Sequence, residues 1–352
     1  MKRTHREHTQ ATYEMSPEHI LEVKDLHVHI AVDDYDLHAV RGVSFSLKKG
    51  ETLGLVGESG CGKSVTSKEI LGINPDNCTG SGQILYRTKA GKVLNLLELS
   101  RDGETYRAIR GSEISMIFQE PMTAFSPLYT IGNQLAEIVL LHDPKATKAS
   151  ARAHVLEMLK KVGIANPEKR IDQYPHEFSG GMLQRALIAM MLCCNPDILI
   201  ADEPTTALDV TIQAQILELM RSLQKEFGMS ILFITHDLGT VANMCDHVAV
   251  MYLGEIIEFG TVHQIFHNPQ HPYTRGLLRS LPKMNQSREK KLYIIDGVVP
   301  LPVELPPCCG FHDRCEACMD DVCPKRDIPE FTVEPGHMVR CMLMEQGARK
   351  HG

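Results

Sequence analysis

The sequence predicts an α/β fold built around a parallel β-sheet. Short apolar runs of similar length occur at 52–56, 114–118, 197–201 and 231–235, and helical stretches separate them. Strands that alternate with helices in this way pair in parallel and are covered on both faces. With 352 residues and 43% hydrophobic side chains, the chain is long enough for about two domains with a sizeable core.

The N-terminal region predicts a tail followed by a smaller sheet. Residues 1–19 are polar and predict a flexible tail. Segments 20–30 and 40–51 alternate apolar and polar side chains, and the second ends at a Lys-Lys-Gly turn. Alternation with a period of two is typical of half-exposed strands. We therefore expect an antiparallel β subdomain ahead of the parallel sheet.

The later regions predict an insertion and an appendage. Residues 141–178 are polar and helical in character, and they interrupt the series of sheet strands. They predict an inserted helical subdomain, at about 122–180, within a main domain at 20–262. After about Gly260 the chain becomes rich in proline and cysteine, so we expect a separate C-terminal extension at 263–352.

Charge and hydropathy exclude several classes of protein. Lys and Arg number 37 and Asp and Glu 44, which gives a formal net charge of −7. This balance argues against a broad basic surface for nucleic acid. The longest apolar run, 186–194, is far shorter than the ~20 residues of a membrane span. The polar, basic start does not resemble a secretory signal. We expect a soluble, internal protein.

One segment has the pattern of a phosphate-binding loop. Residues 57–64 read Gly-Glu-Ser-Gly-Cys-Gly-Lys-Ser, which fits G-x-x-x-x-G-K-[ST] and lies between a predicted strand and a predicted helix. Glycines let successive backbone N–H groups point at phosphate oxygens, Lys63 reaches the terminal phosphates, and Ser64 can ligate Mg²⁺. The sequence thus predicts a nucleoside triphosphate site, whose residues are Gly57, Glu58, Ser59, Gly60, Cys61, Gly62, Lys63, Ser64 and Val65.

Two carboxylates follow the apolar run at 197–201. Asp202 and Glu203 lie where a parallel strand would deliver them to the ligand-binding edge of the sheet. Asp202 is expected to hold Mg²⁺, directly or through water. Glu203 can orient or deprotonate the attacking water in phosphoryl transfer.

Further motifs resemble the nucleotide-binding subunit of an ATP-binding-cassette (ABC) transporter. These are Phe-Ser-Gly-Gly at 178–181, Ile-Phe-Gln-Glu-Pro at 117–121, Thr-Thr-Ala-Leu-Asp at 205–209 and Ile-Thr-His-Asp at 234–237. The resemblance implies a P-loop NTPase (RecA-like) sheet. It also implies that Gln119 contacts Mg²⁺ and that His236 contacts the γ-phosphate. Asp209 would lie in a loop that bridges two subunits. It further implies that Ser179, Gly180 and Gly181 complete the ATP site of the opposing subunit. Tyr35 is either the aromatic side chain that stacks on adenine or an ordinary loop tyrosine.

The C-terminal region resembles the extension of dipeptide and oligopeptide importer ATPases. The matching features are His-Pro-Tyr-Thr-Arg-Gly at 271–276, a proline-rich stretch and a cysteine cluster. More than half of the 11 cysteines fall there. In a long chain that is not expected to be secreted, clustered thiols are more typical of metal binding than of disulfides. The resemblance implies a [4Fe–4S] cluster held by Cys309, Cys315, Cys323 and Cys341, with Cys318 as an alternative to Cys323. Zinc, or no metal, are the other readings.

Together these features predict an ATP hydrolase that drives uptake of di- or oligopeptides, with Glu203, His236 and Lys63 as the catalytic residues. By resemblance, its partners are a second cassette ATPase, two transmembrane permease subunits and an extracellular peptide-binding protein, at the cytoplasmic face of the membrane. The alternatives are import of another small solute such as nickel, a cassette ATPase outside transport, and a small-molecule kinase. No nucleic-acid partner is expected.

Overall fold

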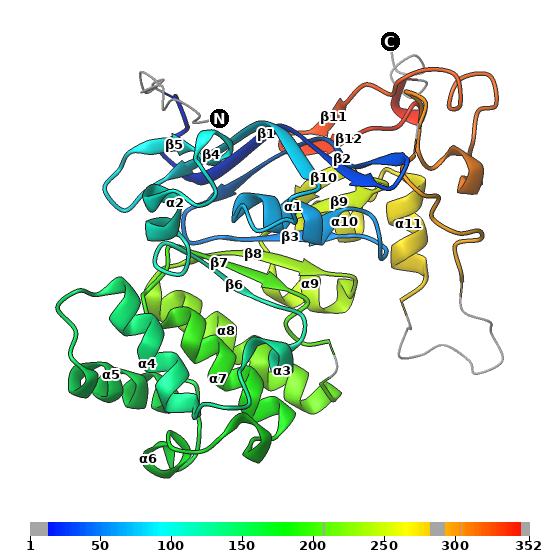
Figure 1. Ribbon diagram of the computed structural model, residues 1–352. Helices are drawn as coiled ribbons and strands as arrows, with labels where there is room; N and C mark the ends of the chain where they lie inside the picture. Colours follow the sequence, from blue (N-terminus) through cyan, green and yellow to red (C-terminus); the bar gives the residue numbers. More distant parts are fainter. Residues whose placement is uncertain (1–12, 207, 282–292, 304, 346–352) are drawn as a thin grey trace, which may run out of the picture.

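The computed structural model describes residues 13–206, 208–281, 293–303 and 305–345. Most of the predicted tail, residues 1–12, lies outside this part of the chain. Figure 1 shows the layers: an antiparallel sheet lies above a larger mixed sheet, and a group of helices lies below. The strand β1 begins at His19, and Arg87 donates to the carbonyls of Met15 and Ser16, which holds residues just before β1 against the fold.

The upper layer is a four-stranded antiparallel sheet with the order β2-β1-β4-β5. Its strands are β1 (His19–Val32), β2 (Tyr35–Lys48), β4 (Cys78–Arg87) and β5 (Val93–Asn95). The alternating segments at 20–30 and 40–51 fall within β1 and at the end of β2. The predicted antiparallel subdomain is confirmed.

The central sheet has eight strands in the order β11-β12-β10-β9-β3-β8-β7-β6. The strands from β9 to β6 pair in parallel, as predicted. They are β3 (Thr52–Val56), β6 (Ile114–Ile117), β7 (Ile198–Asp202), β8 (Ser230–Thr235) and β9 (His247–Tyr252). The antiparallel part consists of β10 (Glu255–Thr261), β11 (Phe331–Glu334) and β12 (His337–Val339).

Both faces of the parallel strands are buried, which explains why they are apolar throughout. In β8, Ile231 and Phe233 pack into one core together with the lower helices. Leu232 and Ile234 point to the opposite face and pack with β1, β2 and α1 (Lys63–Ile70). Side chains alternate between the two faces of a strand, so a continuous apolar run fills two cores at once.

The inserted helices lie below the sheet in Figure 1. They are α3 (Pro121–Ala124), α4 (Ile131–His142), α5 (Lys148–Lys161), α6 (Pro167–Arg170) and α7 (Gly180–Leu192). The remaining helices are α2 (Glu104–Ile109), α8 (Val210–Phe227), α9 (Leu238–Met244), α10 (Val262–His267) and α11 (Pro272–Arg279). Short 3₁₀ turns occur at Leu96–Glu98, Pro175–Glu177 and His312–Arg314.

Part of the C-terminal extension joins the central sheet, whereas the sequence predicts a separate appendage. Strand β12 pairs with β10, and β11 pairs with β12. Between these paired strands, His337 of β12 is hydrogen-bonded to Glu258 of β10 at 2.8 Å, and both side chains are fully buried. Removing one partner of a buried pair is strongly destabilising, so this contact ties the extension to the main domain. Within the described residues, no helix has the length and apolar character needed to cross a bilayer.

Candidate nucleotide site

The phosphate-binding loop connects β3 to α1, as its motif predicts. A Cβ atom at Gly57 would meet the carbonyl oxygen of Met251 at 2.1 Å, and one at Gly62 would meet that of Ala39 at 2.5 Å. Gly62 also has a φ of +102°. Only glycine fits these two positions, because the loop backbone lies directly against the backbone at Met251 and Ala39. The loop leads into the N-terminus of α1, a position where phosphate binds favourably.

Lys63 and Ser64 are the first two residues of α1, and both have polar side chains. The Lys63 ammonium is buried and donates to the carbonyls of Gly57 and Glu58 at 2.8 and 2.9 Å. Ser64 Oγ donates to Asp202 Oδ1 at 3.1 Å across the gap between α1 and the end of β7. A hydroxyl and a carboxylate side by side form the hard oxygen donor set that Mg²⁺ prefers, so these residues fit the predicted ion.

Burial raises the pKa of Asp202, and the hydrogen bond from Ser64 opposes this effect. A bound divalent cation would further favour the ionised carboxylate.

The Glu203 carboxylate is hydrogen-bonded to three other side chains. Its Oε2 accepts hydrogen bonds from Gln119 Nε2 at 3.0 Å and Thr206 Oγ1 at 2.9 Å, and Oε1 is hydrogen-bonded to His236 Nδ1 at 3.0 Å. Partial burial disfavours the charged carboxyl, but the hydrogen bonds from His236 and Thr206 outweigh it and hold the pKa of Glu203 below its usual value. The group is thus a carboxylate at neutral pH.

The backbone at Glu203 is also unusual, because its φ is +49°. Non-glycine residues rarely adopt this left-handed region, and such positions cluster at functional sites. The N–H of Glu203 donates to the carbonyl of Ile234 on β8 at 2.9 Å, which anchors the residue between the two strand ends.

The predicted residues therefore converge at one edge of the sheet. A cavity of about 730 Å³ is lined by Gly57, Glu58, Ser59, Gln119, Glu203 and His236. These residues follow β3, β6, β7 and β8, whose carboxyl ends meet there, as the rule for parallel α/β sheets requires.

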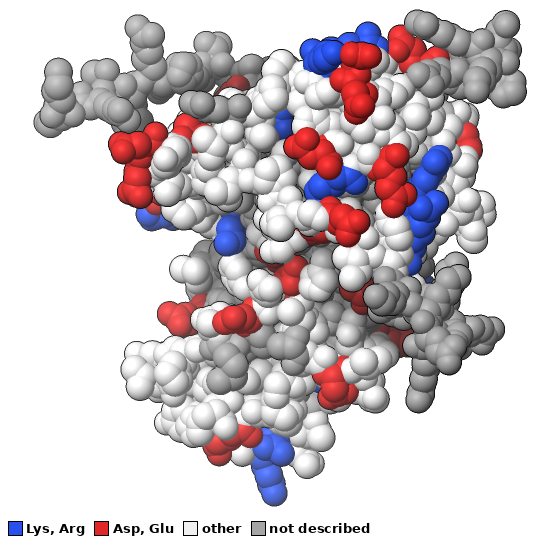
Figure 2. Space-filling model, turned by 90° about the vertical axis from the view of Figure 1, so that its right-hand side faces the viewer, with Lys and Arg blue, Asp and Glu red and all other residues white. Residues whose placement is uncertain are grey.

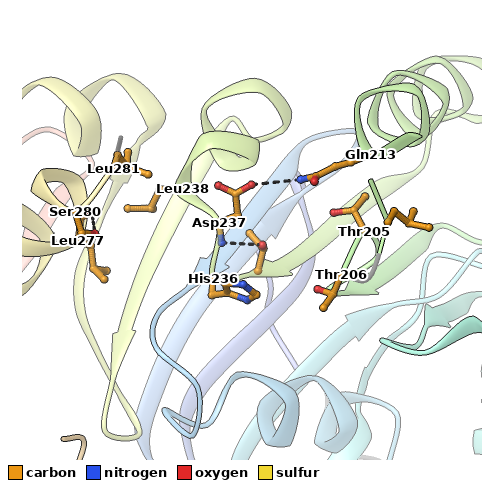
Figure 3. A pocket seen from close by; sticks show the side chains of 11 residues that line it. Thr205, Thr206, Gln213, His236, Asp237, Leu238, Leu277, Ser280 and Leu281 are labelled. Atoms are coloured by element: carbon orange, nitrogen blue, oxygen red, sulfur yellow. Dashed lines mark hydrogen bonds between the residues drawn. The ribbon is translucent and has the colours of Figure 1, made fainter. Parts of the chain in front are cut away.

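A neighbouring pocket of about 480 Å³ shares His236 and Thr206 with this cavity (Figure 3). In it, Gln213 Nε2 donates to Asp237 Oδ2 at 3.3 Å, and the Asp237 N–H donates to Thr235 Oγ1 at 3.0 Å. Leu277 and Leu281, from α11 and its C-terminal end, form the opposite wall in Figure 3. The loop carrying His236 is thus braced by α8 and faces the C-terminal extension.

Comparisons with known proteins identify the family. A family model described as "ABC transporter" matches residues 40–206, and one described as "Oligopeptide/dipeptide transporter, C-terminal region" matches residues 257–323. The dipeptide transport ATP-binding protein DppD of Bacillus subtilis is 51% identical over 94% of this chain and 96% of its own length. The chain belongs to the ABC transporter family of ATP-binding proteins.

Other relatives agree. The oligopeptide transport ATP-binding protein OppD of Bacillus subtilis is 48% identical over 94% of this chain and 90% of its own length. Among solved structures, a post-hydrolysis dimer of the ATP-binding cassette MJ0796 bound to ADP and Pi has a TM-score of 0.60. Its sequence identity is 25%, and the match covers 69% of this chain and 98% of that one. The resemblance and the P-loop NTPase fold predicted from the sequence are confirmed.

The signature segment of this ABC cassette lies on the helical layer. Ser179 caps α7 by accepting from the Met182 N–H at 3.4 Å, so Gly180 and Gly181 form the first residues of that helix. Asp209 caps α8 in the same way, accepting from Thr211 and Ile212. None of these four residues lines the cavity around Glu203. Their roles toward a partner's nucleotide stay predictions. Ala207 of the bridging loop lies outside the described residues.

Tyr35 lies at the β1–β2 hairpin, where 64% of its surface is exposed. It does not line the cavity at the phosphate-binding loop. Its stacking on adenine stays a prediction.

The C-terminal cysteines lie near one another but do not form a recognisable ion site. In the described part of the chain, no group of three or more His, Cys, Asp or Glu side chains is arranged to hold a metal ion. The Cys309 N–H donates to the Cys323 carbonyl at 3.0 Å. Burial, reinforced by Cys323, raises the pKa of Cys309 to about 12. Burial and Cys315 raise that of Cys341 to about 11. The structure therefore does not support the predicted cluster.

Two residues that sequence reasoning missed contact the phosphate-binding loop. Arg314 forms an ion pair with Glu58, and the hydroxyl of Tyr273 accepts from the Glu58 N–H at 2.9 Å. Both belong to the C-terminal extension. The sequence does show an acidic residue, Glu58, inside an anion-binding loop and a tyrosine in the His-Pro-Tyr motif. Neither feature indicates which residue it contacts.

Figure 2 shows acidic and basic side chains interspersed over the face that carries the extension. Among the residues described on this face, no continuous basic surface is visible.

Proposed function

We propose that this chain is the subunit that binds and hydrolyses ATP to power uptake of di- or oligopeptides through partner permeases. The observation that carries the proposal is the convergence of Lys63, Asp202, Glu203 and His236 on one edge of a cassette fold. The peptide class rests on the similarity to the DppD and OppD proteins over nearly the whole chain.

We infer the following role for each side chain. Lys63 supplies a compact positive charge at the loop that holds the terminal phosphates. Ser64, Asp202 and Gln119 would hold Mg²⁺, which neutralises phosphate charge when bound. Glu203, kept ionised by its hydrogen bonds, orients the attacking water and accepts its proton. His236 is hydrogen-bonded to Glu203 and would contact the γ-phosphate.

The chain would act as one of two cassettes, either with a second copy or with a similar ATPase. Each partner's Ser179, Gly180 and Gly181 would close the other's nucleotide site, so that ATP stabilises the closed pair and hydrolysis releases it. The cassette at about 20–262 would transmit closure through Gln119 and the helices of 122–180. Two permease subunits and an extracellular peptide-binding protein would complete the assembly at the cytoplasmic face of the membrane.

Co-purification tests the assembly directly. The chain is tagged at its native level, membranes are solubilised gently, and the recovered proteins are identified. We expect two multi-span proteins, a second cassette ATPase and a peptide-binding protein. Recovery of ribosomal or DNA-bound proteins instead would contradict transport, and a nickel-binding protein in place of the peptide-binding one would change the solute.

We also propose that Cys309, Cys315, Cys323 and Cys341 hold an iron–sulfur cluster, with Cys318 as an alternative ligand. The proposal rests on the sequence resemblance of the C-terminal region and on the grouping of its cysteines, because the side chains in the described part of the chain show no arranged ligand set. Thiolates are the ligands that such clusters require. Protein purified without air should contain iron and sulfide. A colourless product without iron would refute the cluster, and zinc in its place would identify the other metal.

A further inference from the structure

The phosphate-binding loop carries an acidic side chain where a polyanion must approach. Glu58 follows Gly57, and its neighbours Gly57 and Ser59 line the same cavity as Glu203. A carboxylate near a triphosphate opposes its binding by Coulomb repulsion unless a cation compensates the charge. The loop therefore needs a partner for Glu58.

The partner comes from the C-terminal extension. Arg314 Nη1 donates to Glu58 Oε2 at 2.7 Å, and Nη2 donates to Oε1 at 3.0 Å. The Arg314 side chain is only 6% exposed and that of Glu58 is 30% exposed. A bidentate pair with this shielding is stronger and more specific in geometry than an ion pair on an open surface.

Arg314 is itself held in place. Its Nε donates to the Asp296 carbonyl at 2.9 Å, and Nη1 donates to the Tyr252 hydroxyl at 3.3 Å. The guanidinium lies over the rings of Tyr252 and Phe311, at 5.8 and 5.9 Å from their centroids. Fixed in this way, the guanidinium loses little further freedom on meeting the carboxylate.

A second contact from the extension holds the backbone of the same loop residue. The Glu58 N–H donates to the Tyr273 hydroxyl at 2.9 Å, and Tyr273 is fully buried. The Tyr273 ring packs against Tyr252 and Phe311, with centroids 4.8 and 5.3 Å away. Tyr252 ends β9, which pairs with β3, the strand that leads into the loop. Both the side chain and the backbone of Glu58 are thus attached to the extension.

We propose that Arg314 is a positioning residue for ATP binding: it neutralises Glu58 and, with Tyr273, holds the phosphate-binding loop in the form that accepts the triphosphate. The C-terminal extension thereby sets the affinity of the cassette for MgATP. The inference rests on ATP binding at this loop, as in the proposed function, and is independent of the solute transported.

The test measures the Kd of MgATP for the full-length chain by titration calorimetry. Arg314→Ala should raise the Kd about tenfold, equivalent to about 1.4 kcal/mol. Combining it with Glu58→Gln removes the uncompensated charge and should restore the Kd to within about threefold of the wild-type value. Lys325→Ala is the matched control, because it removes a cation from an exposed pair with Asp321 in the same extension, and its Kd should not change.

A second pair of variants acts from the loop side and leaves the extension intact. Glu58→Asp keeps the charge but is one methylene too short for the bidentate pair, so it should weaken binding several-fold. Glu58→Gln keeps the length without the charge and should bind MgATP more tightly than Glu58→Asp. Thermal unfolding shows whether Arg314→Ala is folded. If it is not, the comparison of Glu58→Asp with Glu58→Gln still tests the inference.

Three results would overturn the inference. The first is an unchanged Kd in Arg314→Ala. The second is a raised Kd in Arg314→Ala that the added Glu58→Gln substitution does not lower again. The third is equal MgATP affinity of Glu58→Asp and Glu58→Gln. Failure of the wild-type chain to bind MgATP at all would instead refute the proposed function, so the two outcomes are distinguishable.

Discussion

Replacing Glu203 by glutamine tests the central chemical step. The two side chains have nearly the same size, and the glutamine oxygen can still accept from Thr206 or Gln119, which now surround Glu203 at 2.9 and 3.0 Å. The variant should therefore keep the site geometry and lose only the proton acceptor. Positioned general bases contribute about 10²- to 10⁴-fold in rate, or about 3 to 5 kcal/mol of barrier.

The assay combines phosphate release with MgATP binding and size-exclusion chromatography. Glu203→Gln should release phosphate 10²- to 10⁴-fold more slowly, as the general-base effect implies. It should bind MgATP with wild-type affinity and accumulate as a nucleotide-dependent dimer. Phosphate release at the wild-type rate would remove Glu203 from its catalytic role. Loss of MgATP binding would show that the carboxylate acts in binding instead.

The remaining predictions concern binding, closure and pH. Lys63→Ala removes the buried ammonium of the loop and should abolish measurable MgATP binding by calorimetry, whereas retained affinity would contradict its role. In the Glu203→Gln background, Ser179→Gly should change the stability of the N-terminus of α7 by only a few tenths of a kcal/mol, because glycine is also tolerated at N-cap positions. It should lose the ATP-dependent dimer in size-exclusion chromatography, and a persisting dimer would refute the contact of Ser179 with the partner's nucleotide. Burial lowers the pKa of His271 to about 4, so the unfolded chain binds its proton first as pH falls. The stability that the neutral His271 contributes is present above its unfolded pKa and is lost as pH falls toward about 4. Between pH 7.5 and pH 5 the wild type should therefore lose about 2 kcal/mol more unfolding free energy than His271→Asn, which retains a capping side chain. Equal losses in urea titrations would show that His271 does not set this pH dependence.

The nucleotide site could be predicted from the sequence because its signals are local. The loop at 57–64 and the pair Asp202 and Glu203 each follow an apolar run, and parallel strands bring such positions to one edge. What the sequence could not supply is which strands are neighbours. The 3.1 Å contact between Ser64 and Asp202 depends on β8 lying between β3 and β7, an order that no local pattern encodes.

The C-terminal extension was predicted less well for a physical reason. Strand β12 contains only His337–Val339, too short to show an alternating pattern, so its pairing with β10 was missed and the region was expected to be separate. Arg314 and Glu58 are 256 residues apart, and their contact appears only once both are placed beside Tyr252. Long-range pairs between charged side chains carry no spacing signal at all.

Peptide uptake by cells tests the central claim most directly. Cells that lack this chain, complemented with either the wild type or Glu203→Gln at matched levels, are supplied with a labelled dipeptide and a labelled longer peptide. The account predicts uptake of at least one of them with the wild type, and uptake at the level of uncomplemented cells with Glu203→Gln. Equal uptake by both complemented strains, or none above the uncomplemented level with the wild type, would contradict it.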